Sequence, residues 1–394
     1  MWFPFAVYAL SRVWVLIAGT VLAKTQMALP VGIEHIRIAY PMPADPGYWA
    51  AMTNWDGQWY RIIAEHGYPR ELPRLSDGSI DMNPWAFFPV FPGLVALVMK
   101  VTGLPFIYAG PGLSLLLGFF ALHLLFKLVD RAVGRFEAIV AVVATSFYMA
   151  SPIFSASYTE SIALLLIVAI LLLLRARKYL WVVPMLLVLS LTRNVVVAMV
   201  PVIIAHAVVR WRSGDEGEHP MRLRAGLAAL AVYAGLLTFL WPTIVGILTG
   251  VDGAYEQTML AWKIQTKLKL YMWWNLLYNY WGVWGQVLGV LAVAAFTWFM
   301  LSRHSWRWGP EIWGWAGAYP AYILLVTSTT PSRVRYALLA FPMTLIIAWF
   351  IQLEPWRRWR WWILLGIAVV GAAQMWWWTE HYLIIANLTD DLYP

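Results

Sequence analysis

Long apolar runs separated by short polar segments extend along almost the whole chain. A helix needs about 20 predominantly apolar residues to cross a bilayer, with a range of roughly 17–25. The runs that predict membrane-spanning helices are 3–23, 106–127, 137–153, 158–174, 179–192, 194–210, 223–248, 283–302, 311–328, 334–353 and 360–380. The pattern therefore predicts an all-α, polytopic integral membrane protein with about eleven transmembrane helices, in a range of about 10–12.

The segment 84–103 is the ambiguous part of this pattern. Pro84, Pro89 and Pro92 interrupt its first half and leave only a short apolar run, so we expect a helix lying at the membrane interface. Lys and Arg in short loops favour the cytoplasm. If 84–103 does not cross, the five markedly basic loops and the N-terminus all fall on the cytoplasmic side. These loops carry Lys127, Arg131 and Arg135; Arg175, Arg177 and Lys178; Arg210, Arg212, Arg222 and Arg224; Arg303 and Arg307; and Arg357, Arg358 and Arg360.

This topology places the two longest polar segments, 24–105 and 249–282, on the extracytoplasmic face. The short segments 158–160, 192–194 and 331–335 reach the same face. Polar residues thus converge on one side of the membrane, as an extracytoplasmic active site requires. No internal repeat or low-complexity linker divides the chain, so residues 1–394 are expected to form a single integral membrane domain. Its long first loop, 24–105, would carry interfacial helices.

Composition agrees with this pattern and narrows the function. The chain is 61% hydrophobic and 12% charged, whereas a soluble domain has about 25% charged residues. Its first segment lacks a basic n-region and a small-residue cleavage site, which favours a retained span over a signal peptide. The absence of cysteine excludes disulfides, thiolate metal sites and thiol nucleophiles. The net charge of +8 follows the usual topology of basic loops, so nucleic acid is not an expected partner.

Asp56 is the first candidate for chemistry. Trp55 and Trp59 flank it, and Tyr60 lies one helical turn further on. An acid packed among aromatic rings is partly desolvated, which raises its pKa toward the range useful for a general base. The three aromatic residues would then support the site or line an acceptor groove. An N-cap or a solvated loop acid is the alternative, and the two interpretations are evenly matched.

Glu65 and His66 follow on the same amphipathic helix. We include both among the residues that could support the site or line the acceptor groove. The favoured interpretation, however, is that they lie on a solvated face of this helix. A metal site needs several converging oxygen or nitrogen ligands. The acids and histidine of this loop match no metal spacing, so no metal site is assigned, and dependence on a divalent metal ion stays open.

Glu160, preceded by Tyr158, lies at the outer mouth of a predicted span. A carboxylate entering an apolar helix is a functional candidate by default. An acid in the first helical turn also complements the helix dipole. Both interpretations are compatible with a place beside the active site.

Basic residues on the outer face are candidates for binding a phosphate. Arg193 and Asn194 interrupt two short helices, and a cation there suits a lipid phosphate entering from the bilayer, with snorkelling to the headgroups as the alternative. Arg333 and Arg335 are expected on an outer loop, against the general charge trend, and arginine grips phosphate bidentately. Lys263 and Lys267 lie one turn apart on another outer segment, where ordinary attraction to anionic lipid is slightly preferred.

Several well-known catalytic and nucleotide-binding signatures are absent from the sequence. It contains no Gly-rich phosphate loop, no zinc-protease motif and no serine nucleophile elbow. A nucleotide-binding site is therefore not expected. An extracytoplasmic transferase without nucleotides needs an activated donor carried on a lipid.

The ordered motifs resemble one family. Trp55-Asp56 with Trp59-Tyr60, Glu65 and Gly67-Tyr68 is similar to the first-loop pattern of the PIG-V class of GPI mannosyltransferases. Residues 86–92, 157–161 and 191–194, and Arg335-Tyr336 with Phe341-Pro342, match later blocks of that family in order. The resemblance spans most of the chain. The basic, Trp-rich, cysteine-free composition looks bacterial, of actinobacterial type, which favours a bacterial plasma membrane and leaves the acceptor open.

The resemblance implies a GT-C glycosyltransferase fold and a polyprenyl-phosphate mannose donor. In that scheme Asp56 deprotonates an acceptor hydroxyl, which attacks the anomeric carbon with inversion while Arg193, Arg333 and Arg335 stabilise the departing phosphate. The expected partners are membrane lipids, the polyprenyl-phosphate sugar and a glycolipid or glycan acceptor. A GT-C enzyme for another lipid-linked sugar, a lipid or sugar transporter, and a non-catalytic lipid-binding subunit are the alternatives.

Overall fold

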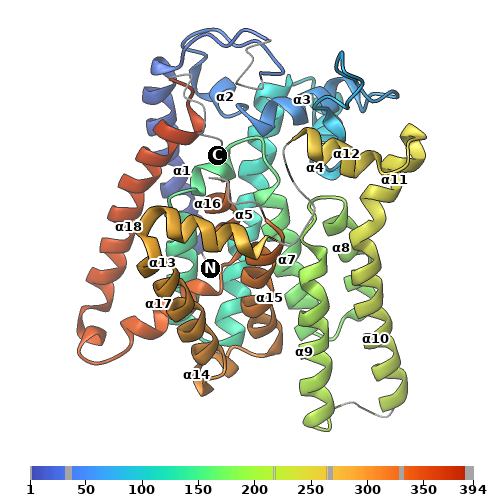
Figure 1. Ribbon diagram of the computed structural model, residues 1–394. Coiled ribbons are helices and arrows are strands. Elements are labelled where there is room, and N and C mark those ends of the chain that lie inside the picture. Colours follow the sequence, from blue (N-terminus) through green and yellow to red (C-terminus); the bar gives the residue numbers. More distant parts are fainter. Residues whose placement is uncertain are drawn as a thin grey trace.

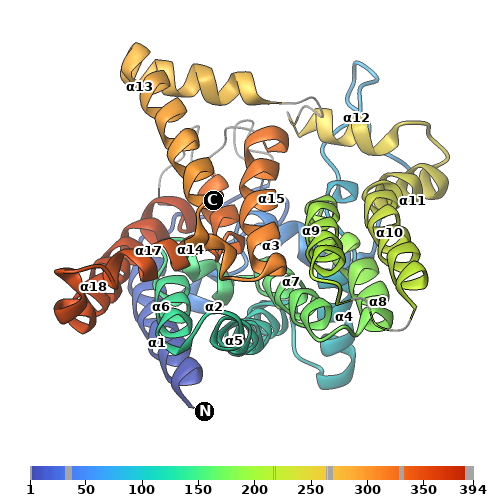
Figure 2. The same ribbon diagram turned by 90° about the horizontal axis from the view of Figure 1, so that it is seen from below.

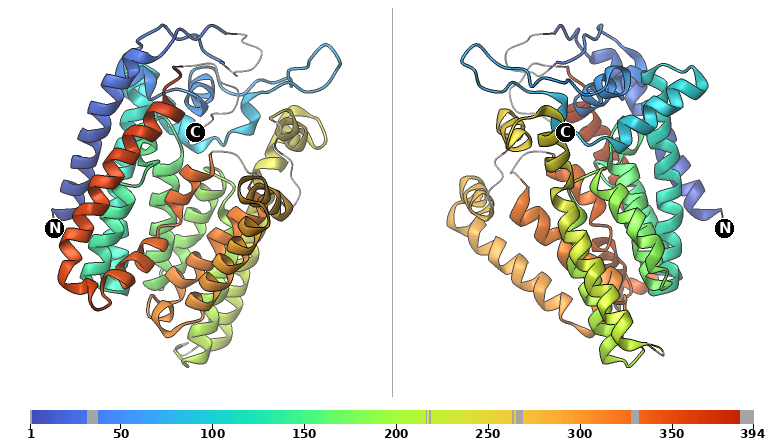
Figure 3. Two further views of the ribbon diagram at one scale, coloured as in Figure 1. Left: turned by 60° about the vertical axis from the view of Figure 1, so that its left-hand side comes forward. Right: turned by 90° about the vertical axis from the view of Figure 1, so that its right-hand side faces the viewer.

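The protein forms a bundle of helices capped at one end by a layer of loops and short helices (Figures 1 and 3). The computed structural model describes residues 2–31, 38–215, 217, 219–262, 264, 269–327 and 332–386. Within these ranges no strand is present, and extended pairing is confined to two isolated bridges, Leu29 with Met42 and Arg74 with Ile80. The prediction of an all-α protein is confirmed.

The longer helices coincide with the apolar runs of the sequence, and several of the shortest helices lie in the segments between these runs. The α-helices are α1 (Phe3–Leu22), α2 (Gly47–Ala51), α3 (Asp56–His66), α4 (Val90–Thr102), α5 (Phe106–Ala132), α6 (Arg135–Ser146), α7 (Glu160–Arg175), α8 (Tyr179–Ser190), α9 (Met199–Arg212), α10 (Pro220–Leu236), α11 (Leu240–Thr249), α12 (Ala254–Ala261), α13 (Leu270–Met300), α14 (Arg303–Trp306), α15 (Pro310–Val326), α16 (Arg333–Tyr336), α17 (Met343–Ile351) and α18 (Arg360–Trp378). Short 3-10 or π turns extend several of them, including η3 (Ser151–Ser155) and η6 (Ala337–Leu339).

Five helical segments are long and apolar enough to cross a membrane. They are Phe3–Thr25, Phe106–Ala132, Pro220–Thr249, Leu270–Met300 and Trp356–Leu383. A sixth candidate is the pair Arg333–Leu339 and Met343–Ile351, which is bent by 72° at its break. The remaining predicted spans fold as helices of 12 to 17 residues, so the number of eleven crossings stays a prediction.

The segment 84–103 does not form a long helix. Its helical part, α4, has 13 residues and is therefore about 20 Å long, less than the hydrocarbon thickness of about 30 Å. The three prolines lie in the first turn of α4 or before it, where a missing N–H costs no helical hydrogen bond. Gly103 ends the helix with φ at +74°, a left-handed conformation that glycine adopts without strain.

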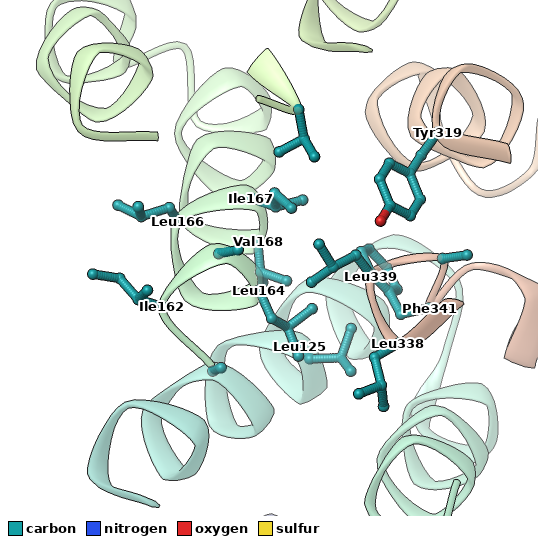
Figure 4. Packing of buried hydrophobic residues seen from close by; sticks show 14 of the residues in the cluster. Leu125, Ile162, Leu164, Leu166, Ile167, Val168, Tyr319, Leu338, Leu339 and Phe341 are labelled. Atoms are coloured by element: carbon teal, nitrogen blue, oxygen red, sulfur yellow. The ribbon is translucent and has the colours of Figure 1, made fainter. Parts of the chain in front are cut away.

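The core of the bundle lies between α5, α7, α15 and the segment around η6. Figure 4 shows Leu164 and Val168 of α7 pointing toward Leu339 of η6, with Leu125 of α5 beside them. All four side chains are fully buried. Because lipid tails are as apolar as leucine, close packing rather than water exclusion holds such helices together in a bilayer. This packing fixes the segment that carries Arg335 against the helix that begins at Glu160.

The basic loops meet at the end of the bundle away from the loop layer. Arg175 donates to the Arg131 carbonyl at 3.2 Å and lies 3.7 Å from Glu311. Gln352 donates to Glu137 at 2.7 Å, and the Arg360 guanidinium lies 5.6 Å from the Phe136 ring. These contacts join the loops between α5 and α6, α7 and α8, and α17 and α18. Which face lies outside the cell stays a prediction.

Candidate active site

The helix α3 presents Asp56 at its first residue. An acid there complements the positive end of the helix dipole. The helix ends at Gly67, which has φ at +78° and donates its backbone N–H to the Ile63 carbonyl. Trp55 directly before it has φ at +58°, an outlier for a bulky residue. Such backbone costs about 1–3 kcal/mol and persists where surrounding structure enforces it, often at functional sites.

Asp56 pairs with an arginine from the far end of the sequence. Arg335 Nη2 lies 2.6 Å from Asp56 Oδ2, and the exposed fractions of the two side chains are 7% and 28%. The sequence predicted an acid packed among aromatic rings, and the structure adds a cation in direct contact with it. Arg335 lies in the short helix α16, where an outer loop was expected.

The pair continues into a chain of alternating charges. Arg335 Nε lies 3.6 Å from Glu160 Oε1, and Arg193 Nη1 donates to the same Glu160 oxygen at 2.6 Å. Glu160 is fully buried. Two acids and two arginines from α3, α7, the turn after α8 and α16 therefore form one continuous cluster, the ion-pair chain Asp56–Arg335–Glu160–Arg193. Burying these charges together is far less costly than burying any of them alone.

Aromatic rings pack on the arginines of the ion-pair chain. The Arg335 guanidinium lies 4.8 Å from the centroid of the Tyr158 ring and 5.2 Å from that of Tyr336. Arg193 lies 4.5 Å from the same Tyr336 ring. Cation–π contacts of this kind are strongest when desolvated. Tyr336 was not among the predicted site residues, although its place beside Arg335 in a family-like motif was the available signal.

Two polar contacts hold the start of α3 against the ion-pair chain. The Tyr158 hydroxyl accepts the backbone N–H of Asp56 and donates to the Asn54 carbonyl, both at 3.3 Å. The fully buried Asn54 amide donates to Gln26 and to the Leu383 carbonyl at 2.8 and 2.9 Å. The position of Asp56 is thus fixed both by the segment that precedes α7 and by the residues that follow α18.

Close packing by glycine brings the Tyr158 segment near α3 and α5. A Cβ atom at Gly110 of α5 would lie 2.4 Å from Ser157 Oγ, and one at Gly57 would lie 3.4 Å from Ser157 Cβ. A side chain at position 110 would force Ser157 to shift, so glycine favours this close approach. Small residues at helix contacts are a common device of membrane proteins.

Arg12 supports the same segment from α1. Its guanidinium donates to the Ser151 carbonyl at 2.6 Å, the Ser146 carbonyl at 3.2 Å and the Ser155 hydroxyl at 3.2 Å. These groups lie where α6 ends and η3 begins, so Arg12 satisfies carbonyls that the helix end leaves open. Arg12 was not among the predicted site residues, because a single arginine in an apolar run carries no motif that points to its partners.

The aromatic residues after Asp56 form a wall between the two long loops. Trp59 stacks on Phe87 with ring centroids 6.0 Å apart and meets Trp262 edge-on at 4.9 Å. Tyr60 is buried against Phe87 and Phe91, and this burial raises the pKa of Tyr60.

Glu65 and His66 lie outside the ion-pair chain. Glu65 pairs with Arg61 at 2.9 Å and accepts the Tyr40 hydroxyl at 2.6 Å, a hydrogen bond that raises the pKa of Tyr40. The His66 side chain is 67% exposed. His66 is thus exposed to solvent, whereas Glu65 is partly buried and joins Arg61 and Tyr40.

The remaining candidates fall into three groups. Asn194 follows Arg193 in the same turn, and its side chain makes no hydrogen bond to the described residues. The Arg333 guanidinium lies 4.3 Å from the ring of Trp273 on α13. Lys263 and Lys267 lie outside the described residues. Within the described ranges, no three acids or histidines gather as a metal site.

The comparisons with known proteins are sparse. No protein-family model and no curated protein matches the chain. Among solved structures, the chain is similar to the oligosaccharyltransferase of Archaeoglobus fulgidus, crystallised with zinc and sulfate. The identity is 13%, the TM-score is 0.44, and the match covers 97% of this chain. The chain spans 57% of the length of that protein.

Proposed function

We propose that this protein is an inverting glycosyltransferase that moves mannose from a polyprenyl-phosphate mannose donor to a lipid- or glycan-linked acceptor. The observation that carries this proposal is the ion-pair chain Asp56–Arg335–Glu160–Arg193, assembled from four separate parts of the sequence. It combines what such a reaction needs, an accessible carboxylate and two cations able to meet a phosphate. The PIG-V-like motifs support the choice of donor.

Arg335 and Arg193 would receive the donor phosphate. Nη1 of Arg335 is buried and has no hydrogen-bond partner among the described residues, so it can donate to an entering phosphate oxygen. Arginine remains charged at every relevant pH and binds phosphate through two parallel hydrogen bonds. Glu160, which contacts both guanidinium groups, would keep them at the right separation.

Asp56 would act as the general base, because it is the accessible acid of the cluster. In the reaction, the acceptor O–H proton passes to Asp56 while the acceptor oxygen forms a bond to the anomeric carbon. The bond from that carbon to the phosphate oxygen breaks, and the electron pair leaves with the polyprenyl phosphate. A phosphate bound to Arg335 would compete with Asp56 for that guanidinium and so release the carboxylate for proton transfer.

The aromatic wall offers a surface for the acceptor. Trp59 lies three residues after Asp56 on α3, and side chains three apart share a helix face. Trp262 meets Trp59 from the second long loop. Sugar rings pack their C–H faces on such indoles, so an acceptor held here would reach Asp56.

A lipid or sugar transporter is the second candidate function. The break of 72° between α16 and α17 resembles the discontinuous helices of transporters. Transporters, however, place their charged sites near the membrane midplane. Here the charges lie at the first residues of α3 and α7, under the loop layer.

The deciding experiment incubates the purified protein with radiolabelled polyprenyl-phosphate mannose and extracted glycolipid acceptors. We expect label in a product that no longer contains the polyprenyl phosphate. Movement of the labelled lipid across a vesicle membrane without transfer would instead identify a transporter. Transfer from another lipid-linked sugar alone would correct the donor. Binding of the labelled lipid with neither transfer nor movement would identify a non-catalytic subunit. The same assay with a chelator settles metal dependence.

A further inference from the structure

The ring of Tyr336 lies against both arginines of the ion-pair chain. Its centroid is 4.5 Å from the Arg193 guanidinium and 5.2 Å from the Arg335 guanidinium. The hydroxyl end of the ring is also close enough to interact electrostatically with both cations. One phenol group therefore stands beside the two cations that the proposed function assigns to the donor phosphate.

The backbone of Tyr336 is held in place by α15. The buried Tyr319 donates its hydroxyl to the Tyr336 carbonyl at 2.9 Å, and the buried Trp315 donates its indole N–H to the Leu339 carbonyl at 2.8 Å. Figure 4 shows the Tyr319 hydroxyl pointing toward the segment that carries Leu339. A group whose backbone is fixed before binding loses little conformational freedom when it takes up a ligand.

The Tyr336 hydroxyl is available to a ligand. It makes no hydrogen bond to the described residues and is not buried. The hydroxyls of Tyr158 and Tyr319, by contrast, already bond to the backbone of Asn54 and Tyr336. A phenol O–H can donate one hydrogen bond and carries no charge at neutral pH. It would thus add a contact to an anion without a further cation that needs an acid partner.

We propose that Tyr336 binds the donor, with its hydroxyl donating a hydrogen bond to an oxygen of the phosphate that Arg193 and Arg335 receive. This role rests on the proposed function, since the phosphate is the one that the donor would bring. The ring keeps its place against the guanidinium groups, and the hydroxyl at its edge supplies the contact. Hydrogen bonds to charged acceptors contribute about ten- to hundredfold in affinity.

Binding of polyprenyl phosphate to the intact, purified protein in detergent tests this proposal. This lipid carries the phosphate but no sugar, so the measurement needs no transfer, and polyprenol of the same length lacks the phosphate. Tyr336→Phe keeps the ring and removes only the hydroxyl. We expect its affinity for polyprenyl phosphate to fall about tenfold, with the affinity for polyprenol unchanged.

Two controls separate phosphate binding from a structural role. Because the hydroxyl has no partner among the described residues, Tyr336→Phe without ligand should unfold at the temperature of the wild type. Tyr233 is a partly buried tyrosine of α10 whose hydroxyl also lacks a partner among the described residues. Figure 2 shows α9 lying between α10 and α15, so Tyr233→Phe should keep the wild-type affinity for both lipids.

The outcomes distinguish this proposal from the proposed function. Wild-type affinity of Tyr336→Phe for polyprenyl phosphate would overturn the role of Tyr336, whether or not the wild type transfers mannose. Equal losses for polyprenyl phosphate and polyprenol, or an equal loss in Tyr233→Phe, would also overturn it. A wild type that binds polyprenyl phosphate through Tyr336 but transfers no sugar would refute only the proposed function. A wild type that does not bind polyprenyl phosphate would refute both.

Discussion

Arg335 contacts Asp56 at 2.6 Å across 279 positions of sequence, and the same guanidinium reaches Glu160 at 3.6 Å. One side chain therefore joins the most accessible acid of the site to its most buried one. Substitutions at the two acids should have different consequences. Asp56 is expected to affect turnover, and Glu160 is expected to affect the integrity of the site.

Asp56→Asn should lower turnover about 10²–10⁴-fold, the usual cost of removing a general base. The amide keeps the shape of the side chain but cannot take up the acceptor proton. Donor binding should not weaken, because the arginines remain and the competing carboxylate charge on Arg335 is gone. The measurement is mannosyl transfer with purified protein, with Asp77→Asn, an exposed acid of the same loop, as the control. Normal turnover by a well-folded Asp56→Asn protein would eliminate Asp56 as the base.

Glu160→Gln should destabilise the fold by about 3–5 kcal/mol, the usual cost of removing one partner from a buried ion pair. The substitution removes the negative charge that Arg193 and Arg335 share, and Arg193 then has no acid partner among the described residues. Thermal unfolding in detergent measures the effect. Glu65→Gln is the matched control, because its pair with Arg61 is partly exposed and such pairs contribute about 0.2–1 kcal/mol. Equal stability of the two variants would contradict this account of Glu160.

Arg12→Leu should destabilise the bundle, because the Ser151 carbonyl loses its guanidinium donor and the Ser146 carbonyl keeps only the Ser151 hydroxyl, at 2.7 Å. Each unsatisfied group costs about 1–3 kcal/mol. Arg12→Lys keeps the charge but offers fewer directed donors, so its unfolding temperature should fall between those of the wild type and Arg12→Leu. An Arg12→Leu protein as stable as the wild type would show that these hydrogen bonds are dispensable.

Stability should fall in alkaline solution partly because of Tyr60. Burial raises the pKa of Tyr60 in the folded state, whereas an unfolded tyrosine titrates near about pH 10. Below that pH both states keep the proton and stability is unaffected. Above it only the unfolded state loses the proton, so each pH unit removes about 1.4 kcal/mol. Unfolding followed from pH 8 to about pH 11.5 should show a shallower decline for Tyr60→Phe, and identical slopes would refute this contribution.

The apolar pattern predicted the helices well because the formation of a helix depends on residues that are close together in the sequence. It predicted α3 around Asp56, the break at Arg193 and the start of α7 at Glu160, since prolines, polar turns and charges interrupt the runs there. The number of crossings was harder to predict. Residues 179–190 and 343–351 form helices of 12 and 9 residues, and hydropathy alone does not show how such short pieces combine.

The candidate site was predictable in its members but not in its pairing. Asp56, Glu160, Arg193 and Arg335 stood out because charge is costly in a membrane. Their order in the ion-pair chain depends on how α3, α7 and α16 pack, which involves contacts between distant residues. Arg333 was predicted to bind the phosphate together with Arg193 and Arg335. It lies only two residues from Arg335, but its guanidinium contacts the Trp273 ring and is not part of the ion-pair chain. This difference too depends on contacts between distant residues. The roles of Arg12 and Tyr336 likewise depend on partners far away in sequence.

The ion-pair chain Asp56–Arg335–Glu160–Arg193 is electroneutral, with two negative and two positive groups. Any phosphate that enters therefore brings an excess negative charge into a site that has no spare cation within the chain. The donor phosphate and the Asp56 carboxylate would therefore compete for the same Arg335 guanidinium, and the donor could bind only as Asp56 leaves it. Arrival of the donor and exposure of the carboxylate would then be a single event, so that the carboxylate is freed only when there is a sugar to transfer.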